Sequence, residues 1–346
     1  MRVLVHLDLQ RRLKRSGIYT AYSQHRRALE GCDGVELVEG GGNLARLSRT
    51  FRRQGPDIDI AHTHLFGPSS LVLAAMAKRH DIPLVCHAHV TKEDFRDSFR
   101  GSNQLALPLG AYLKRWYSRG DLVICPSEYT KRRLEAYPVT APIEAVSNGI
   151  DLESLDGFES LRETYRDRYD LEGTVVFCLG NVFERKGVDT FIEVAKRCPE
   201  LEFVWFGPYD TGLSASQTVK EAVTNPPPNV TFTGWIEDKR GGLAAGDIFL
   251  LPSHEENQGI AVLEAMACGK PVVLRDLPVF HEYASDGEDC RMANDVDEFV
   301  AVIQRLVANP KEADALGEAA NETAQEHRLE VVGERLLEHY RQLIDG

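Results

Sequence analysis

Short apolar runs alternate with longer amphipathic segments along the first half of the chain. The run RVLVHLD at 2–8 has the length of a strand, and the segment from about Gly17 to Glu30 has the spacing of a helix. Similar apolar runs predict strands at 58–64, 82–90 and 121–127. Buried strands that alternate with helices are typical of parallel sheets with right-handed crossovers. The pattern therefore predicts a doubly wound α/β domain.

A second alternation follows the turn at Asn148-Gly149, a dipeptide that favours tight turns. The sequence thus predicts two Rossmann-like domains, residues 1–148 and 149–332, with a C-terminal helix at about 333–346 that packs back onto the first. Such domains bind ligands at the carboxyl ends of their strands, so we expect a central cleft between two facing domains. Five further apolar runs predict the strands of the second domain, at 174–181, 202–207, 229–235, 247–253 and 270–276.

Composition agrees with two soluble α/β domains, because the 346 residues are 43% hydrophobic and 27% charged. No apolar run reaches the roughly 18–20 residues of a membrane-spanning helix. The N-terminal run is followed by charges too soon for a signal peptide. Seven dispersed cysteines without a CxxC pair indicate neither a disulfide framework nor a zinc ribbon. We therefore expect a cytoplasmic protein. The tail from about 309 to 344 is predicted to be helical throughout.

The net charge of −13 is unevenly distributed. Residues 1–150 hold 22 Lys plus Arg against 15 Asp plus Glu, or +7, and the remainder holds 18 against 38, or −20. The basic clusters lie at 11–15, 46–53 and 114–117, and the last two interleave apolar residues with cations, as interfacial helices do. They favour contact with an anionic membrane surface, and a solvated surface without a partner is the alternative. No recognisable motif points to nucleic acid.

One candidate anion site follows the apolar stretch TVVFC, residues 174–178. The loop LGNVFERKG places Gly180 at the strand end and Arg185, Lys186 and Gly187 directly before a helix. Helix amides that lack partners, the helix dipole and two cations together attract a phosphate group. A surface loop with solvated basic side chains is the alternative interpretation.

A second candidate site lies in SHEENQGIAVLEA, residues 253–265. Glu256 precedes a helix predicted from Gly259 to Cys268, and Glu264 lies just over one turn into it. Carboxylates accept hydrogen bonds from sugar hydroxyls, while amides at the helix start donate to hydroxyls or phosphate. An acidic first turn that favours the helix dipole explains Glu256 equally well. It does not explain Glu264, a carboxylate in an otherwise apolar segment.

Four histidines lie in pairs on one face of two predicted strands, by the two-residue period of a strand. They are His62, His64, His87 and His89. Zinc binding is one interpretation. Hydrogen bonding to a substrate, with His89 nearest the loop, is the interpretation we favour.

In the first domain Ser16-Gly17 opens a helix, either as an ordinary N-cap or as a loop that closes over a diphosphate.

The combination of E-x7-E, RKG, PSEYT at 126–130 and SNGID at 147–151 resembles the retaining nucleotide-sugar glycosyltransferases of family 4 over almost the whole chain. That family has the GT-B fold of two facing Rossmann-like domains. HVTKEDFRDSFRGSNQL at 89–105 and EENQGIAVLEAMA are similar to the prokaryotic diacylglycerol glycosyltransferases. The resemblance implies a peripheral enzyme on the inner face of the cell membrane.

By motif position, the resemblance implies that Glu264 holds the donor ribose and that Glu256 contacts the sugar near its reacting carbon. Lys186 with Arg185 would stabilise the departing diphosphate. The family often has an arginine where this chain has Asn181, so Arg185 is expected to supply that charge. The other implied contacts are Gly17, Gly180, Asn257, Gln258, Gly259 and Ile260 to the donor, His89 to the transferred sugar, and Glu93 and Asp94 to the acceptor.

The implied reaction is retaining transfer of glucose or galactose from a UDP-sugar to a membrane glycerolipid. No cofactor is expected, and no metal ligand, because no Asp-x-Asp pair stands where a metal clamp is needed and lysine with arginine can replace Mg²⁺. A family member that acts on a polysaccharide, glycan or polyprenyl-linked acceptor remains an alternative. A nucleotide-sugar 2-epimerase and a non-catalytic membrane sensor remain two others.

Overall fold

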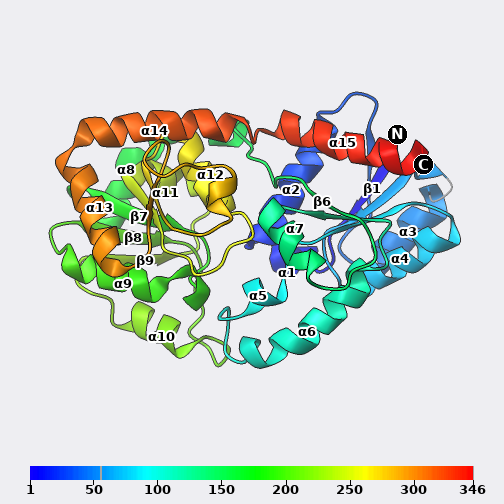
Figure 1. Cartoon of the computed structure of the whole chain (residues 1–346), viewed down its shortest axis with the longest axis horizontal. Coiled ribbons are helices and arrows are strands. Elements are labelled where there is room, and N and C mark those ends of the chain that lie inside the picture. Colours follow the sequence, from blue (N-terminus) through cyan, green and yellow to red (C-terminus); the bar gives the residue numbers. More distant parts are fainter. Residues whose placement is uncertain (55–56, 346) are drawn as a thin grey trace. The chain divides into compact units, whose positions relative to one another are not determined.

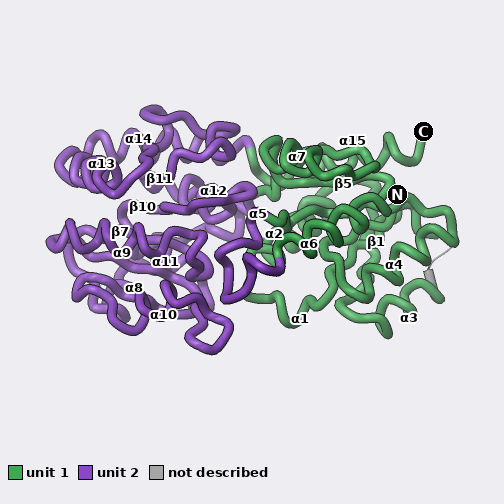
Figure 2. The backbone as a smooth tube through the Cα atoms, turned by 60° about the horizontal axis from the view of Figure 1, so that its bottom comes forward, with its two compact units in different colours: residues 1–92, 106–149, 327–346 green, residues 93–105, 150–326 purple. Residues whose placement is uncertain are grey.

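The computed structural model describes residues 1–54 and 57–345, which form two compact units (Figure 2). Unit 1 comprises Met1–Lys92, Ala106–Gly149 and His327–Gly346, and unit 2 comprises Glu93–Leu105 and Ile150–Glu326. Residues 93–105 thus lie in unit 2, although their place in the sequence assigned them to the first domain. Each unit is an α/β fold built on one parallel sheet.

Unit 1, whose first strand β1 and last helix α15 are labelled in Figure 1, contains a six-stranded parallel sheet in the order β2-β1-β3-β4-β5-β6. The order reverses between β1 and β3, both of which pair with their neighbours in parallel register. The strands are short and buried on both faces because helices cover both sides. Their bounds are β1 Arg2–His6, β2 Glu36–Glu39, β3 Ile60–Thr63, β4 Leu84–His87, β5 Leu122–Cys125 and β6 Ile143–Ala145.

Two hydrophobic clusters fill the two faces of this sheet. Side chains alternate along β1, so that Leu4 belongs to one cluster and Val3 and Val5 to the other. Helices α3, α4, α6 and α7 contribute to the cluster of Leu4, and α2 and α15 to the opposite one. The helices are α1 Gln10–Leu13, α2 Gly17–Glu30, α3 Leu44–Gln54, α4 Pro68–Arg79, α6 Ser102–Tyr117, α7 Glu128–Glu135 and α15 Leu329–Asp345.

Unit 2 contains a second six-stranded parallel sheet, in the order β12-β11-β10-β7-β8-β9. This is the order of a dinucleotide-binding Rossmann sheet, and its reversal lies between β7 and β10. The strands are β7 Val175–Leu179, β8 Glu202–Phe206, β9 Val230–Gly234, β10 Ile248–Leu251, β11 Val272–Arg275 and β12 Arg291–Ala293. The helices are α5 Lys92–Phe95, which starts at the unit boundary, α8 Arg162–Tyr169, α9 Val188–Arg197, α10 Gln217–Thr224, α11 Lys239–Ala245, α12 Ile260–Ala267, α13 Val296–Ala308 and α14 Pro310–Gln325.

The C-terminal tail is not helical throughout, contrary to the sequence-based expectation. Helix α14 ends at Gln325 in unit 2, and α15 begins at Leu329 in unit 1. Helix α15 packs closely on α2, because a Cβ on Gly333 would lie 2.6 Å from the carbonyl oxygen of Ala28. The break lets the last helix complete the core of unit 1.

The apolar residues among the basic clusters serve the core, contrary to our expectation of interfacial helices. Leu47 and Phe51 of α3 are buried, as are Trp116 and Tyr117 at the end of α6. Their cationic neighbours are exposed, so these helices present charge without an apolar stripe between the cations. Among the described residues, no helix is long and apolar enough to cross a membrane.

Candidate active site

Two loops of unit 2 leave β7 and β10, on either side of the point where the strand order reverses. Ligands of doubly wound sheets bind at such points. After β7 the chain passes Gly180, forms a short 3₁₀ turn at Glu184–Lys186 and enters α9. Gly187 lies where the backbones of the two loops come into close contact. Its φ is +74°, and a Cβ there would lie 2.0 Å from the carbonyl oxygen of Pro252. Only glycine allows this approach.

Lys186 and Glu256 form a buried ion pair between the two loops. Lys186 Nζ lies 2.5 Å from Glu256 Oε1, which also accepts a hydrogen bond from Ser253 Oγ at 2.9 Å. Glu256 is 6% exposed. Burial alone would raise the pKa of this carboxyl group, but the charges of Lys186 and Arg185 outweigh burial and lower the pKa. Glu256 is therefore an anion at neutral pH.

Arg185 is held by the segment 93–105 that groups with unit 2. Its Nη1 lies 3.0 Å from Asp94 Oδ1 and 4.0 Å from Glu256 Oε1, and its Nε donates to Ser98 Oγ at 3.1 Å. Burial raises the pKa of the Asp94 carboxyl, and the charge of Arg185 offsets only part of that effect. Asp94, assigned to the acceptor from the sequence, therefore contacts the cation assigned to the diphosphate.

Glu264 is buried on α12 and paired with a residue that sequence reasoning missed. It is 3% exposed, and Lys239 Nζ of α11 donates to its Oε1 at 2.6 Å. Burial would lower the pKa of Lys239, but the Glu264 carboxylate outweighs burial and raises it. Nothing local marks Lys239, which lies 25 positions before Glu264. Glu264, the carboxylate in the apolar segment, is thus a buried charge that a partly exposed lysine compensates.

The segment from Asn257 to Ile260 leads into α12 as predicted. Gly259, at φ +88°, is the N-cap of this helix. Gln258 is buried, and its carbonyl oxygen accepts a hydrogen bond from Tyr283 Oη at 2.8 Å. Tyr283 is a second residue that the sequence did not point to, since it lies beyond β11. Its bond fixes the backbone beside Glu256.

The remaining sequence-predicted residues lie elsewhere. Gly17 begins α2 in unit 1, where Ser16 is the N-cap and accepts from the amide of Tyr19. A Cβ on Gly17 would meet no atom within 4 Å, so the space above it is open. His89 follows β4 in unit 1, with its Nε2 3.0 Å from His64 Nδ1. Glu93 lies on α5, in the segment that belongs to unit 2.

Two family models match this chain. The model described as glycosyl transferases group 1 matches residues 173–309, and the model described as glycosyltransferase family 4 matches residues 31–154. The first match contains the two loops with the Lys186–Glu256 pair, and the second contains most of the unit 1 sheet.

Curated relatives agree with these models. The chain is 31% identical to the processive diacylglycerol alpha-glucosyltransferase of Acholeplasma laidlawii, over 99% of both chains. It is 33% identical to the alpha-galactosylglucosyldiacylglycerol synthase of Streptococcus pneumoniae over 45% of this chain and 44% of that one.

Solved structures show the same fold at low identity. HepE of Anabaena, in complex with UDP and glucose, superposes with a TM-score of 0.77 at 19% identity, covering 99% of this chain and all of that one. Sucrose-phosphate synthase of Thermosynechococcus elongatus superposes with a TM-score of 0.79 at 17% identity and full coverage. The fold class predicted from the sequence, GT-B, is confirmed. With its two sheets, its paired loops and a full-length relative at 31% identity, the chain belongs to the family 4 glycosyltransferases.

Proposed function

We propose that this glycosyltransferase moves a hexose, glucose or galactose, from a UDP-sugar to a membrane glycerolipid, with retention of the anomeric configuration. The observation that carries the proposal is the full-length similarity to a diacylglycerol glucosyltransferase, in a chain whose unit 2 pairs Lys186 with Glu256 at the switch point. Two of the curated relatives quoted above carry diacylglycerol in their names, so the acceptor class rests on more than one relative.

The donor site proposed here is assembled in unit 2. Structures of HepE, which share the fold, contain UDP or UDP-glucose, and this supports a uridine nucleotide as the donor carrier. Lys186 has three N–H donors, so it can hold Glu256 and still donate to a diphosphate oxygen. Glu264, fixed by Lys239, would accept from the ribose hydroxyl groups. Main-chain amides at 257–260 would complete the site.

In the proposed mechanism the diphosphate leaves as the acceptor hydroxyl attacks from the same face of the sugar. The departing oxygen takes the acceptor's proton, and positive charge develops on the sugar ring between the two events. Lys186 and Arg185 stabilise the charge of the leaving group, which is where preorganised cations lower a barrier most. Glu256, an anion held in place by Lys186 and Ser253, faces the positive sugar ring.

We further propose that no metal ion takes part in this step, because two cations already stand at the leaving group. The test uses protein stripped with a chelator and assayed well below its melting temperature. Transfer that persists, and that millimolar Mg²⁺ or Mn²⁺ does not raise, supports the proposal. Recovery of activity only on addition of these ions would contradict it.

A membrane surface is proposed as the site of action. The exposed cations of α1 and α3 supply the attraction to anionic lipid, since each basic residue near such a surface contributes about 1 kcal/mol. Leu44, at the start of α3, is 44% exposed beside these cations, and Leu107 of α6 is 69% exposed. Leu44 and Leu107 can therefore contact the lipid, whereas Leu47 and Phe51 are buried in the core and cannot.

The experiment that tests the function measures transfer of labelled sugar from UDP-glucose and UDP-galactose into mixed micelles, with and without diacylglycerol and an anionic lipid. Lipid-dependent UDP release with label in the organic phase is the expected result. UDP release without labelled lipid would indicate a soluble or polyprenyl-linked acceptor. Interconversion of nucleotide sugars without release would indicate a 2-epimerase, and binding without either reaction a sensor.

A further inference from the structure

Five histidines of unit 1 gather in the interior beside the switch point of its sheet. His62 lies on β3, His64 directly after it, His87 at the end of β4 and His89 two residues further on. The fifth, His25, comes from α2, and nothing in its sequence context pointed to this group. The rings stack: those of His64 and His87 have centroids 4.9 Å apart and planes at 9°.

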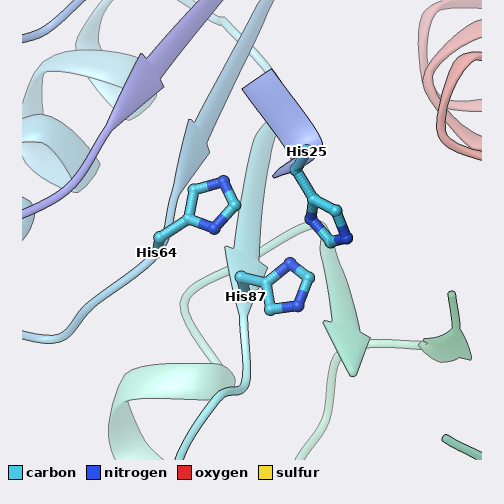
Figure 3. A group of neighbouring side chains, drawn as sticks. All are labelled: His25, His64 and His87. Carbon is cyan, nitrogen blue, oxygen red and sulfur yellow. The ribbon is translucent and has the colours of Figure 1, made fainter. Parts of the chain in front are cut away.

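Three of these side chains converge (Figure 3). His25, His64 and His87 each offer a ring nitrogen, and the three nitrogens lie within 4.8 Å of one another. All three residues are at most 2% exposed. The free ring nitrogens are His25 Nδ1, His64 Nε2 and both nitrogens of His87, none of which has a hydrogen-bond partner among the described residues. Buried polar atoms without partners are rare, and each requires a reason.

The bonds that do exist orient two of the rings for metal binding. His25 Nε2 lies 2.9 Å from the carbonyl oxygen of Ser147, and a carbonyl can only accept, so this nitrogen carries the proton. The lone pair of His25 therefore lies on the unpartnered Nδ1. His64 Nδ1 lies 3.0 Å from His89 Nε2, and when His64 is the donor its free Nε2 also carries a lone pair. Metal-binding histidines typically donate their other N–H to a carbonyl or a similar acceptor in this way.

Burial also keeps these rings in the form that binds metals. It lowers the pKa of His25 to about 4 and those of His64 and His87 well below their usual value, so all three are neutral at pH 7. Neutral imidazoles are ligands for zinc, copper, nickel and cobalt, whereas calcium and magnesium require oxygen ligands. Among the residues that the structure describes, no carboxylate belongs to this convergent group.

We propose that His25, His64 and His87 form a buried three-histidine site for a transition-metal dication of the zinc type, which stabilises unit 1. The three nitrogens lie within 4.8 Å of one another, and metal–nitrogen bonds of about 2.0–2.1 Å would draw them to within about 3.4 Å. A water molecule would complete the four ligands that zinc prefers. The three histidines belong to unit 1, whereas the residues of the proposed diphosphate site belong to unit 2.

The test titrates Zn²⁺ and Co²⁺ into the full-length chain after the metal has been removed with a chelator. We expect one ion per chain by calorimetry, a visible Co²⁺ spectrum of nitrogen ligands, and a melting temperature that rises with the ion concentration. His87→Gln and His25→Gln, on different elements, should each weaken binding by more than the about 10–100-fold typical of second-shell changes.

Two control variants test whether metal binding depends on these three histidines and not on other histidines of unit 1. His80→Gln removes an exposed histidine of unit 1 and should leave binding unchanged. His62→Gln removes a ring of the same stack whose Nδ1 bonds Tyr340 Oη at 2.6 Å, so it should lower stability but retain the ion. The proposal is overturned if the wild-type chain binds neither ion, or if binding survives in both His25→Gln and His87→Gln. The calorimetric readout does not depend on transfer activity, so the metal site and the proposed function can fail independently.

Discussion

Lys186 of the loop after β7 and Glu256 of the loop after β10 form an ion pair of 2.5 Å at the switch point of unit 2. Each side chain therefore fixes the other, and the pair brings a cation and an anion to the place where a doubly wound sheet binds its ligand. The Lys186–Glu256 pair is thus both a structural link between two loops and the centre of the proposed donor site.

Replacing Lys186 with methionine should lower kcat for sugar transfer about 100–1000-fold, because the leaving diphosphate loses a preorganised cation. The variant should also be less stable by about 3–5 kcal/mol, since Glu256 is left as a buried charge. Steady-state kinetics and urea unfolding measure the two effects. Lys196→Met, at an exposed position on α9, is the matched control. The double variant with Glu256→Gln should regain stability but not activity, and an unchanged kcat in Lys186→Met would exclude this lysine from the site.

Glu264→Gln should weaken the binding of UDP while leaving the fold intact. The ribose loses a charged acceptor worth about 1.5–3 kcal/mol, which corresponds to an about 10–150-fold rise in the Kd of UDP. Calorimetry with UDP measures this directly. Glu318→Gln, which changes an exposed acid on α14, serves as the control. Equal UDP affinity in the wild-type chain and Glu264→Gln would show that Glu264 only balances the charge of Lys239.

Asp94→Asn distinguishes a residue that positions Arg185 from one that contacts the acceptor. If Asp94 acts through the 3.0 Å contact with Arg185, the variant should lower lipid transfer and donor hydrolysis by similar factors. If it contacts the lipid, only transfer should fall, with a higher KM for the acceptor. We expect the first result, because Asp94 contacts Arg185 in the structure. Asp97→Asn, in the same segment but bonded to Asn103, is the comparison variant.

The stabilising contribution of Glu256 should vary with pH only in the acidic range. Its pKa in the folded chain is lowered from 4.5, so the unfolded chain binds the proton more readily. The contribution of Glu256 is therefore fully present above pH 4.5 and is lost as pH falls through the lower, folded pKa. Urea unfolding of the wild-type chain and of Glu256→Gln should show a constant difference in unfolding free energy from pH 8 to about pH 5.5, and a shrinking difference below 4.5. A difference that shrinks already between pH 7 and 6 would contradict the lowered pKa.

Arg46→Gln with Arg49→Gln should weaken binding to vesicles that contain anionic lipid by about 30-fold, from about 1 kcal/mol for each cation removed. The effect should diminish at high salt because surface charges are screened. Arg168→Gln with Arg197→Gln removes the same charge from exposed positions of unit 2 and should have little effect. Vesicle co-sedimentation measures both. Equal losses in the two double variants would indicate that net charge alone, not α3, sets binding.

Local patterns in the sequence determined the secondary structure and the place of the site. Short apolar runs between amphipathic segments predicted two parallel sheets, because a strand buried on both faces needs apolar residues throughout. Gly187 and Gly259 were placed at the starts of two predicted helices, and both have positive φ in the structure. The loop residues Lys186 and Glu256 were predicted because each lies between an apolar strand and the start of a helix, where backbone amides lack partners.

Only the tertiary structure decided which side chains meet. Lys239 and Glu264 are 25 positions apart, and Asp94 and Arg185 are 91 apart, so no local pattern links them. The apolar residues among the basic clusters suggested a membrane face, but Leu47 and Trp116 are buried, because a helix turns its residues to different sides and packing chooses the side. His25 contacts the rings of His64 and His87 because helix α2 packs on that face of the sheet. Long-range packing, which a linear pattern does not encode, sets the charged partners of Asp94 and Glu264.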